Sequence, residues 1–109
     1  MEERFNVEGK VQGIFFRKTF LFALVQRGLE GGATNNSQNK NLVHCTAKGP
    51  ETECKKLKED LLNALKVNSL GAKVEKLTEV DHGIEIHEHQ ANTKETPQPR
   101  LPMGIGLTF

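Results

Sequence analysis

The segment with the clearest chemical potential is Gly9-Lys10-Val11-Gln12-Gly13-Ile14-Phe15-Phe16-Arg17, near the N-terminus. A strand-like run precedes it and a helical pattern follows it, so its glycines fall in a short loop before a helix. The first turn of a helix offers backbone N–H groups without partners, and these bind anions. Arg17 adds a permanent charge and a planar donor group that fits phosphate or carboxylate. The residues predict an oxyanion site. The alternative is an ordinary strand–turn–helix joint, because short glycine motifs are weakly specific.

The spacing of hydrophobic residues predicts the elements that must position this loop. Strands are expected over residues 4–11, 29–35, 42–48, 74–80 and 84–87, and helices over residues 17–27 and from residue 51 to about residue 65. The order strand, helix, strand, strand, helix, strand, strand indicates an α+β fold. Its simplest form is a ferredoxin-like sandwich, an antiparallel sheet with two helices on one face.

Composition limits the possible partners. The 109 residues include 15 Lys and Arg against 14 Asp and Glu, so the charges nearly cancel. A balanced surface has no broad field to attract nucleic acid or an anionic membrane, and any anion site must be local. No stretch approaches the roughly 20 apolar residues of a membrane span, and the charged N-terminus lacks a secretory signal. Two cysteines are too few for a disulfide scaffold, so we expect a reduced, cytoplasmic setting. The size of the chain and the lack of a spare apolar face favour a monomer.

The pattern of elements stops after His89, which predicts a domain over residues 1–89 and a tail over residues 90–109. Pro97 and Pro99 favour an extended chain in the tail. The last residues, 101–109, are more apolar, so they either dock on the domain or bind a partner.

Cysteine and histidine are candidates for other chemistry. Alternation places Cys45 on the inner face of its strand, which indicates a small core residue rather than a nucleophile. A Cys45–Cys54 disulfide is the less favoured alternative. His82, His87 and His89 could ligate a metal, but no pattern of further ligands supports this, so neither a metal nor another cofactor is predicted.

Two motifs together resemble the acylphosphatase family. Its members carry a Gly-x-Val-Gln-Gly-Val-x-Phe-Arg signature, which this chain matches from residue 9 to residue 17 with Ile14 in place of valine. A second family segment, Gly-Leu-x-Gly-Trp-Val-x-Asn, is matched at Gly28, Leu29, Gly31 and Asn35. The separation of the two motifs also agrees with the family.

The resemblance implies a ferredoxin-like fold and hydrolysis of the carboxyl–phosphate bond of acyl phosphates, a small-molecule substrate, without a metal. It also implies that Arg17 holds the phosphate while Asn35 orients the attacking water. Inorganic phosphate is then expected as a product or inhibitor. The phosphate-binding residues would be those of the loop and the first helical residues, through their backbone N–H groups: Gln12, Gly13, Ile14, Phe15, Phe16 and Arg17.

The chain also departs from the family pattern. Gly32 and Ala33 stand where the family has tryptophan and valine. This loss of apolar area predicts a looser strand around Asn35.

Two other functions stay open. One is a non-catalytic module of the same fold that binds anions or RNA. The absence of Tyr and Trp argues against RNA, which such sheets bind through exposed aromatic residues. The other is an accessory domain of a larger protein.

Overall fold

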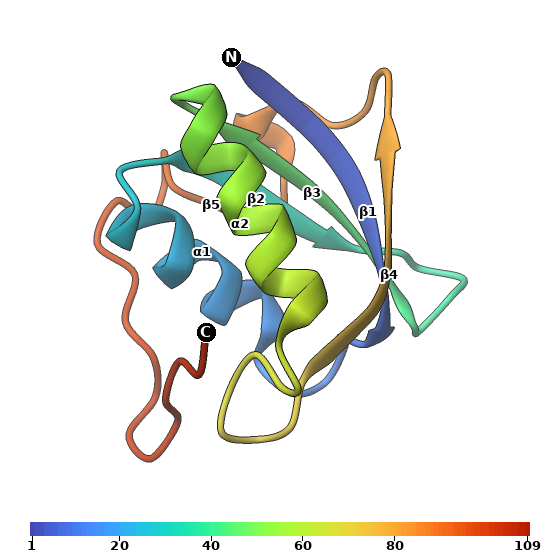
Figure 1. Cartoon of the computed structure of the whole chain (residues 1–109), viewed down its shortest axis with the longest axis vertical. Helices are drawn as coiled ribbons and strands as arrows, with labels where there is room; N and C mark the ends of the chain where they lie inside the picture. The colour runs from blue at the N-terminus through green and yellow to red at the C-terminus, as the bar shows by residue number, and fades with distance from the viewer.

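The computed structural model describes all 109 residues as five strands, two α-helices and a 3-10 turn (Figure 1). In chain order the elements are β1 (Glu2–Lys10), α1 (Phe16–Gln26), β2 (Glu30–Asn35), β3 (Leu42–Lys48), α2 (Glu51–Asn63), β4 (Lys73–Val80), the 3-10 turn η1 (Ile86–Glu88) and β5 (Ala91–Asn92).

The strands form one antiparallel sheet in the order β4-β1-β3-β2-β5. Both helices cover the same face of this sheet (Figure 1). The fold is a ferredoxin-like α+β sandwich, as the sequence predicts. Strands β1 and β2 flank β3, and both are antiparallel to it, so they run in the same direction. The loop after β1 and the last residue of β2 therefore lie at the same end of the sheet.

The core lies between the sheet and the helices. Phe5 and Val7 of β1 point into it, as the alternation predicts, and both are fully buried. Phe20 of α1 lies at the centre, with its ring edge-on to Phe5 at 6.0 Å between centroids and stacked on Phe16 at 6.1 Å. Phe20 thus links the first turn of α1 to the core side of β1.

Helix α2 begins directly after Pro50 and carries Glu51 and Glu53 in its first turn, where acids interact favourably with the helix dipole. Its buried residues include Cys54, and Cys45 of β3 is also buried; both thiols are free. The prediction that the helix extends to Leu65 is wrong. The helix ends at Asn63, and the Leu65 side chain is 89% exposed.

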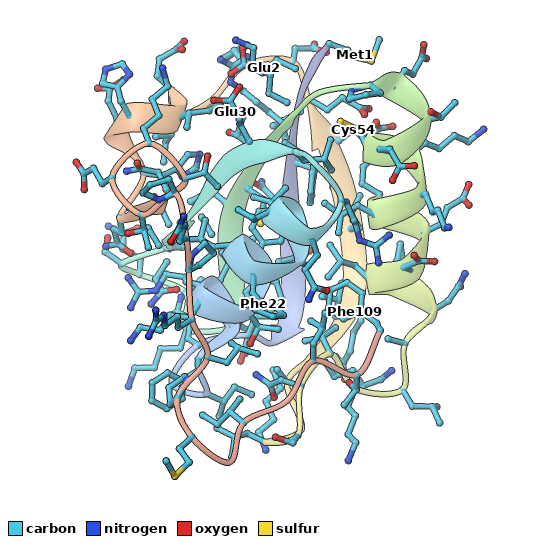
Figure 2. All side chains as sticks on the ribbon, turned by 90° about the vertical axis from the view of Figure 1, so that its left-hand side faces the viewer. Met1, Glu2, Phe22, Glu30, Cys54 and Phe109 are labelled. Atoms are coloured by element: carbon cyan, nitrogen blue, oxygen red, sulfur yellow. The ribbon has the colours of Figure 1, made fainter.

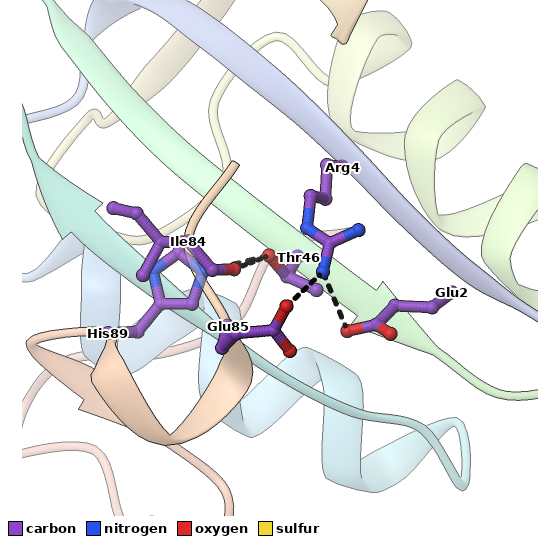
Figure 3. A network of polar contacts seen from close by, with 6 residues as sticks. All are labelled: Glu2, Arg4, Thr46, Ile84, Glu85 and His89. Atoms are coloured by element: carbon purple, nitrogen blue, oxygen red, sulfur yellow. Dashed lines mark hydrogen bonds and ion pairs between the residues drawn. The ribbon is translucent and has the colours of Figure 1, made fainter. Parts of the chain in front are cut away.

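The other face of the sheet is covered by residues 81–90 (Figure 3). Arg4 of β1 forms ion pairs with Glu85 at 3.1 Å and with Glu2 at 3.5 Å, and the Ile84 carbonyl accepts a hydrogen bond from the Thr46 hydroxyl at 3.2 Å. The strand predicted over residues 84–87 is wrong. Ile86 is buried in a 3-10 turn instead, and the fifth strand forms at Ala91–Asn92.

The chain after β5 runs along α1 and docks on the loop between α2 and β4 (Figure 1). Leu107 forms a β-bridge with Asn68, and Ser69 N–H donates to the Gly106 carbonyl at 2.9 Å. Phe109 packs on the core and faces the Arg27 guanidinium, next to the helices (Figure 2). Residues 101–109 therefore dock on the domain. The predicted boundary between a domain over residues 1–89 and a tail over residues 90–109 stays a prediction.

Neither helix has the length and apolar composition needed to cross a membrane.

Candidate active site

The loop between β1 and α1 has a backbone suited to an anion. Gly13 and Phe15 both have left-handed conformations, with φ of 79° and 60°. Alternation of left- and right-handed residues turns successive N–H groups toward a common point. None of the backbone N–H groups of residues 12–16 donates to another protein group, although the rest of the loop is tightly held. The loop therefore presents a row of free donors at the N-terminus of α1.

Gln12 fixes this loop to the β2–β3 hairpin. Its side-chain nitrogen lies 2.8 Å from the Leu42 carbonyl oxygen, 3.0 Å from that of Asn39 and 3.1 Å from that of Asn36. The hairpin is the segment that directly follows Asn35. The side chain of Gln12 thus sets the loop against the strand end that carries the second candidate residue.

Asn68 fixes the loop from the opposite side. It is fully buried, and its amide nitrogen donates to the Ile14 carbonyl at 2.9 Å and to the Thr19 hydroxyl at 3.0 Å. The Thr19 hydroxyl in turn donates to the Phe15 carbonyl at 2.8 Å. Because these bonds engage the carbonyl groups of the loop, the N–H groups are left facing outward.

Arg17 and Asn35 line the same cavity, which has a volume of about 630 Å³. Gly13, Phe15 and Phe16 line it as well. Gln12 and Ile14, the other two residues predicted to bind phosphate, do not line the cavity with their side chains. Gln12 is turned to the hairpin and Ile14 packs against the core.

The amide oxygen of Asn35 is buried and accepts no hydrogen bond from the protein. A buried acceptor without a partner costs roughly 1–3 kcal/mol. A hydrogen bond from a ligand O–H group that reached this oxygen would remove that cost.

The cavity is electrostatically positive. Arg17, Lys18 and Arg100 line it, no acidic residue does, and none of the three forms an ion pair. Lys18 lies over the Phe15 ring, 5.7 Å from its centroid. In a chain of formal net charge +1, the positive charge at this site is local rather than general.

Sequence reasoning missed Gln90, which also lines the cavity. Its side-chain oxygen accepts hydrogen bonds from Arg17 Nη1 and from the Asn35 backbone N–H, each at 2.9 Å. No local signal marks Gln90, because it belongs to a polar segment without periodicity.

His89, the preceding residue, is buried above Gly32 on the face of the sheet away from the helices. Its two ring nitrogens lie 2.8 Å from the Thr34 and Thr46 hydroxyls. Burial, with smaller contributions from His44 and Arg4, lowers the pKa of His89 to about 4. Its imidazole is therefore neutral at pH 7. His82, His87 and His89 form no group that could hold a metal ion.

Comparisons with known proteins identify the family of this chain. The acylphosphatase family model matches residues 3–96. The chain belongs to the acylphosphatase family. The match includes both motifs that carry Arg17 and Asn35, so the resemblance seen in the sequence is confirmed. Among curated proteins no match was found.

Solved acylphosphatases have the same fold. The enzyme from Bacillus subtilis is 27% identical, with a TM-score of 0.61 over 81% of this chain and 91% of that chain. The acylphosphatase from Coxiella burnetii is 26% identical, with a TM-score of 0.61 over 77% of this chain and 82% of that chain. Full-length HypF in its phosphate- and nucleotide-bound form is 21% identical, with a TM-score of 0.52 over 84% of this chain and 11% of that chain. This last likeness shows the fold alone.

Proposed function

We propose that this acylphosphatase-family chain hydrolyses the carboxyl–phosphate bond of acyl phosphates, releasing a carboxylate and inorganic phosphate without a metal. One observation carries the proposal: Arg17, Asn35 and a loop with free backbone N–H groups meet at one positively charged cavity. The enzyme would act on a small molecule, as the family does, and we keep the prediction of a cytoplasmic monomer.

Arg17 and the N–H groups of residues 12–17 would hold the phosphoryl group. In phosphoryl transfer, negative charge spreads over the equatorial oxygens of the transition state. Donors fixed before the substrate arrives stabilise this charge without reorganisation. The bonds of Gln12 and Asn68 to the loop supply that rigidity.

Asn35 would orient the attacking water through its buried, unpartnered amide oxygen. The water oxygen attacks phosphorus, the bond between phosphorus and the acyl oxygen breaks, and the carboxylate leaves with both electrons of that bond. A proton from the water is released to solvent. Because the carboxylate is a good leaving group, positioning of the water supplies much of the rate enhancement and a strong base is not required.

The test is the hydrolysis of benzoyl phosphate in the presence of EDTA. Wild-type turnover should survive chelation, and both Arg17→Ala and Asn35→Ala should lower kcat/KM by about 100-fold or more. Arg17→Lys should also lose most activity, because a point charge cannot replace the planar donor group. Asn41→Ala, at an exposed asparagine of the same hairpin, is the matched control and should retain activity.

Inorganic phosphate should inhibit competitively. Wild-type turnover no faster than the spontaneous reaction would overturn the enzymatic function. If phosphate still bound in that case, the result would favour the non-catalytic anion-binding module.

A further inference from the structure

One oxygen atom joins the two candidate catalytic residues. Gln90 Oε1 accepts a hydrogen bond from Arg17 Nη1 and another from the backbone N–H of Asn35, both at 2.9 Å. Arg17 belongs to α1 and Asn35 ends β2, so these residues come from different elements. Gln90 lies more than 50 residues further along the chain and links them directly.

The backbone at Gln90 is pinned to β2. Its N–H donates to the Thr34 hydroxyl at 3.0 Å, and the Thr34 oxygen lies 2.8 Å from His89 Nδ1. The other ring nitrogen of His89 contacts the Thr46 hydroxyl, which donates to the Ile84 carbonyl. A neutral imidazole that accepts at Nδ1 and donates at Nε2 satisfies every group in this series. The side chain of Gln90 therefore extends from a fixed point.

The contact leaves Arg17 free to bind an anion. A guanidinium carries five N–H donors, and Gln90 uses one of them. Gln90 is uncharged, so it orients the guanidinium without neutralising it. A carboxylate at this position would instead form an ion pair with Arg17 and compete with phosphate.

We propose that Gln90 is a positioning residue that fixes the Arg17 guanidinium relative to Asn35, and so aligns the bound phosphoryl group with the attacking water. This inference rests on the proposed function of the same site. The opposite role is that the Gln90 oxygen occupies the place of a phosphate oxygen and obstructs binding. The two roles predict opposite changes in phosphate affinity when the oxygen is removed.

Two variants test the role. Gln90→Met keeps the length of the side chain and removes the acceptor. It should raise KM and the phosphate inhibition constant and lower kcat, with a combined loss in kcat/KM of about tenfold or more. Gln90→Glu keeps the acceptor and adds a charge beside Arg17. It should weaken phosphate binding further at pH 7, because the new carboxylate pairs with Arg17 and competes with phosphate for the guanidinium.

The matched control is Gln98→Glu, which makes the same charge change in the same exposed segment but does not line the cavity. It should leave KM and the phosphate inhibition constant unchanged. A loss of phosphate binding in Gln90→Glu that Gln98→Glu does not share would show that the charge acts on Arg17 by direct contact.

A ligand-free measurement separates this inference from the proposed function. The backbone amide signal of Asn35 in a ¹H–¹⁵N spectrum should move in Gln90→Met and stay in Gln98→Glu. An active wild type whose kinetic constants and Asn35 signal are unchanged in Gln90→Met would overturn the inference, and so would tighter phosphate binding in that variant. A wild type without turnover would instead overturn the proposed function, whatever the Asn35 signal shows.

Discussion

His89 packs directly on Gly32. A β-carbon at Gly32 would lie 2.7 Å from the His89 Cβ and 2.8 Å from the Ala91 carbonyl oxygen, both closer than real contacts allow. The family signature has a tryptophan at this position of β2. In this chain a buried imidazole from a distant segment covers the strand, so the glycine does not leave β2 unsupported before Asn35.

Replacement of Gly32 by alanine should therefore displace the segment of His89 and Gln90. We expect a loss of about 1–3 kcal/mol in the free energy of unfolding, measured with urea, because backbone and imidazole must both move. The kcat/KM for benzoyl phosphate should fall with it. Gly106→Ala is the control, since a β-carbon there meets open space, and it should change neither quantity. Equal stability of the two variants would contradict the packing argument.

Stability should depend on pH through His89. The folded protein holds the pKa of His89 near 4, below the ordinary value of 6.5, so the unfolded chain takes up the proton first as the pH falls. The neutral imidazole makes its full contribution to the free energy of unfolding above about pH 6.5. This contribution is lost as the pH falls from 6.5 to 4, and the loss is about 3 kcal/mol at most.

The measurement is urea unfolding from pH 7.5 to pH 4 in wild type and in His89→Gln. The variant should lose less stability over this interval than wild type. His87→Gln alters an exposed histidine two residues away and should keep the wild-type slope. An unchanged slope in His89→Gln would show that other groups cause the pH dependence.

Asn68→Asp tests the support of the anion-binding loop. A carboxylate would keep the bonds from the N–H groups of Leu70 and Ala72 but would face the Ile14 carbonyl oxygen in place of a donor. We expect a loss of about 2 kcal/mol or more in stability and weaker inhibition by phosphate, because the loop must shift. Asn63→Asp adds the same charge at the exposed last residue of α2, so it should lose less than about 1 kcal/mol of stability and leave phosphate inhibition unchanged.

The docked C-terminal segment should contribute to stability. Phe109→Ala removes a ring that packs on the core and faces Arg27 at 5.6 Å, so we expect a loss of about 1 kcal/mol in urea unfolding. Met103→Ala changes a fully exposed side chain of the same segment and should have no effect. Equal stability of the two variants would mean that the segment is not docked in solution.

The local parts of this structure could be predicted from the sequence. Alternation in β1 and helical spacing in α1 identify Phe5, Phe16 and Phe20 as core residues, and all are buried. The motif that contains Arg17 predicts the loop, and the second motif singles out Asn35 among several turn asparagines. The structure places both residues at one cavity, while their catalytic roles stay proposals.

The parts that depend on distant contacts could not be predicted. Gln90 acquires its partners only because His89 inserts above Gly32, and nothing in the local pattern of either residue indicates this. Ile84 and Ile86 alternate with polar residues as in a strand. The segment turns away from the sheet because Ile86 and His89 are buried on its outer face. Asn68 likewise looks like an ordinary turn residue until Ile14 is placed beside it.

The side chain of Gln12 has a consequence for how this chain can vary in length. Its single nitrogen contacts carbonyl oxygens at Asn36, Asn39 and Leu42, and the Asn36 side chain closes the turn between them through the N–H groups of Gln38 and Asn39. An insertion or deletion inside this turn would shift at least one of these carbonyl groups and, through Gln12, the loop beside Arg17. Changes in hairpin length, tolerated in most surface turns, should therefore be selected against here even though no residue of the turn contacts the cavity.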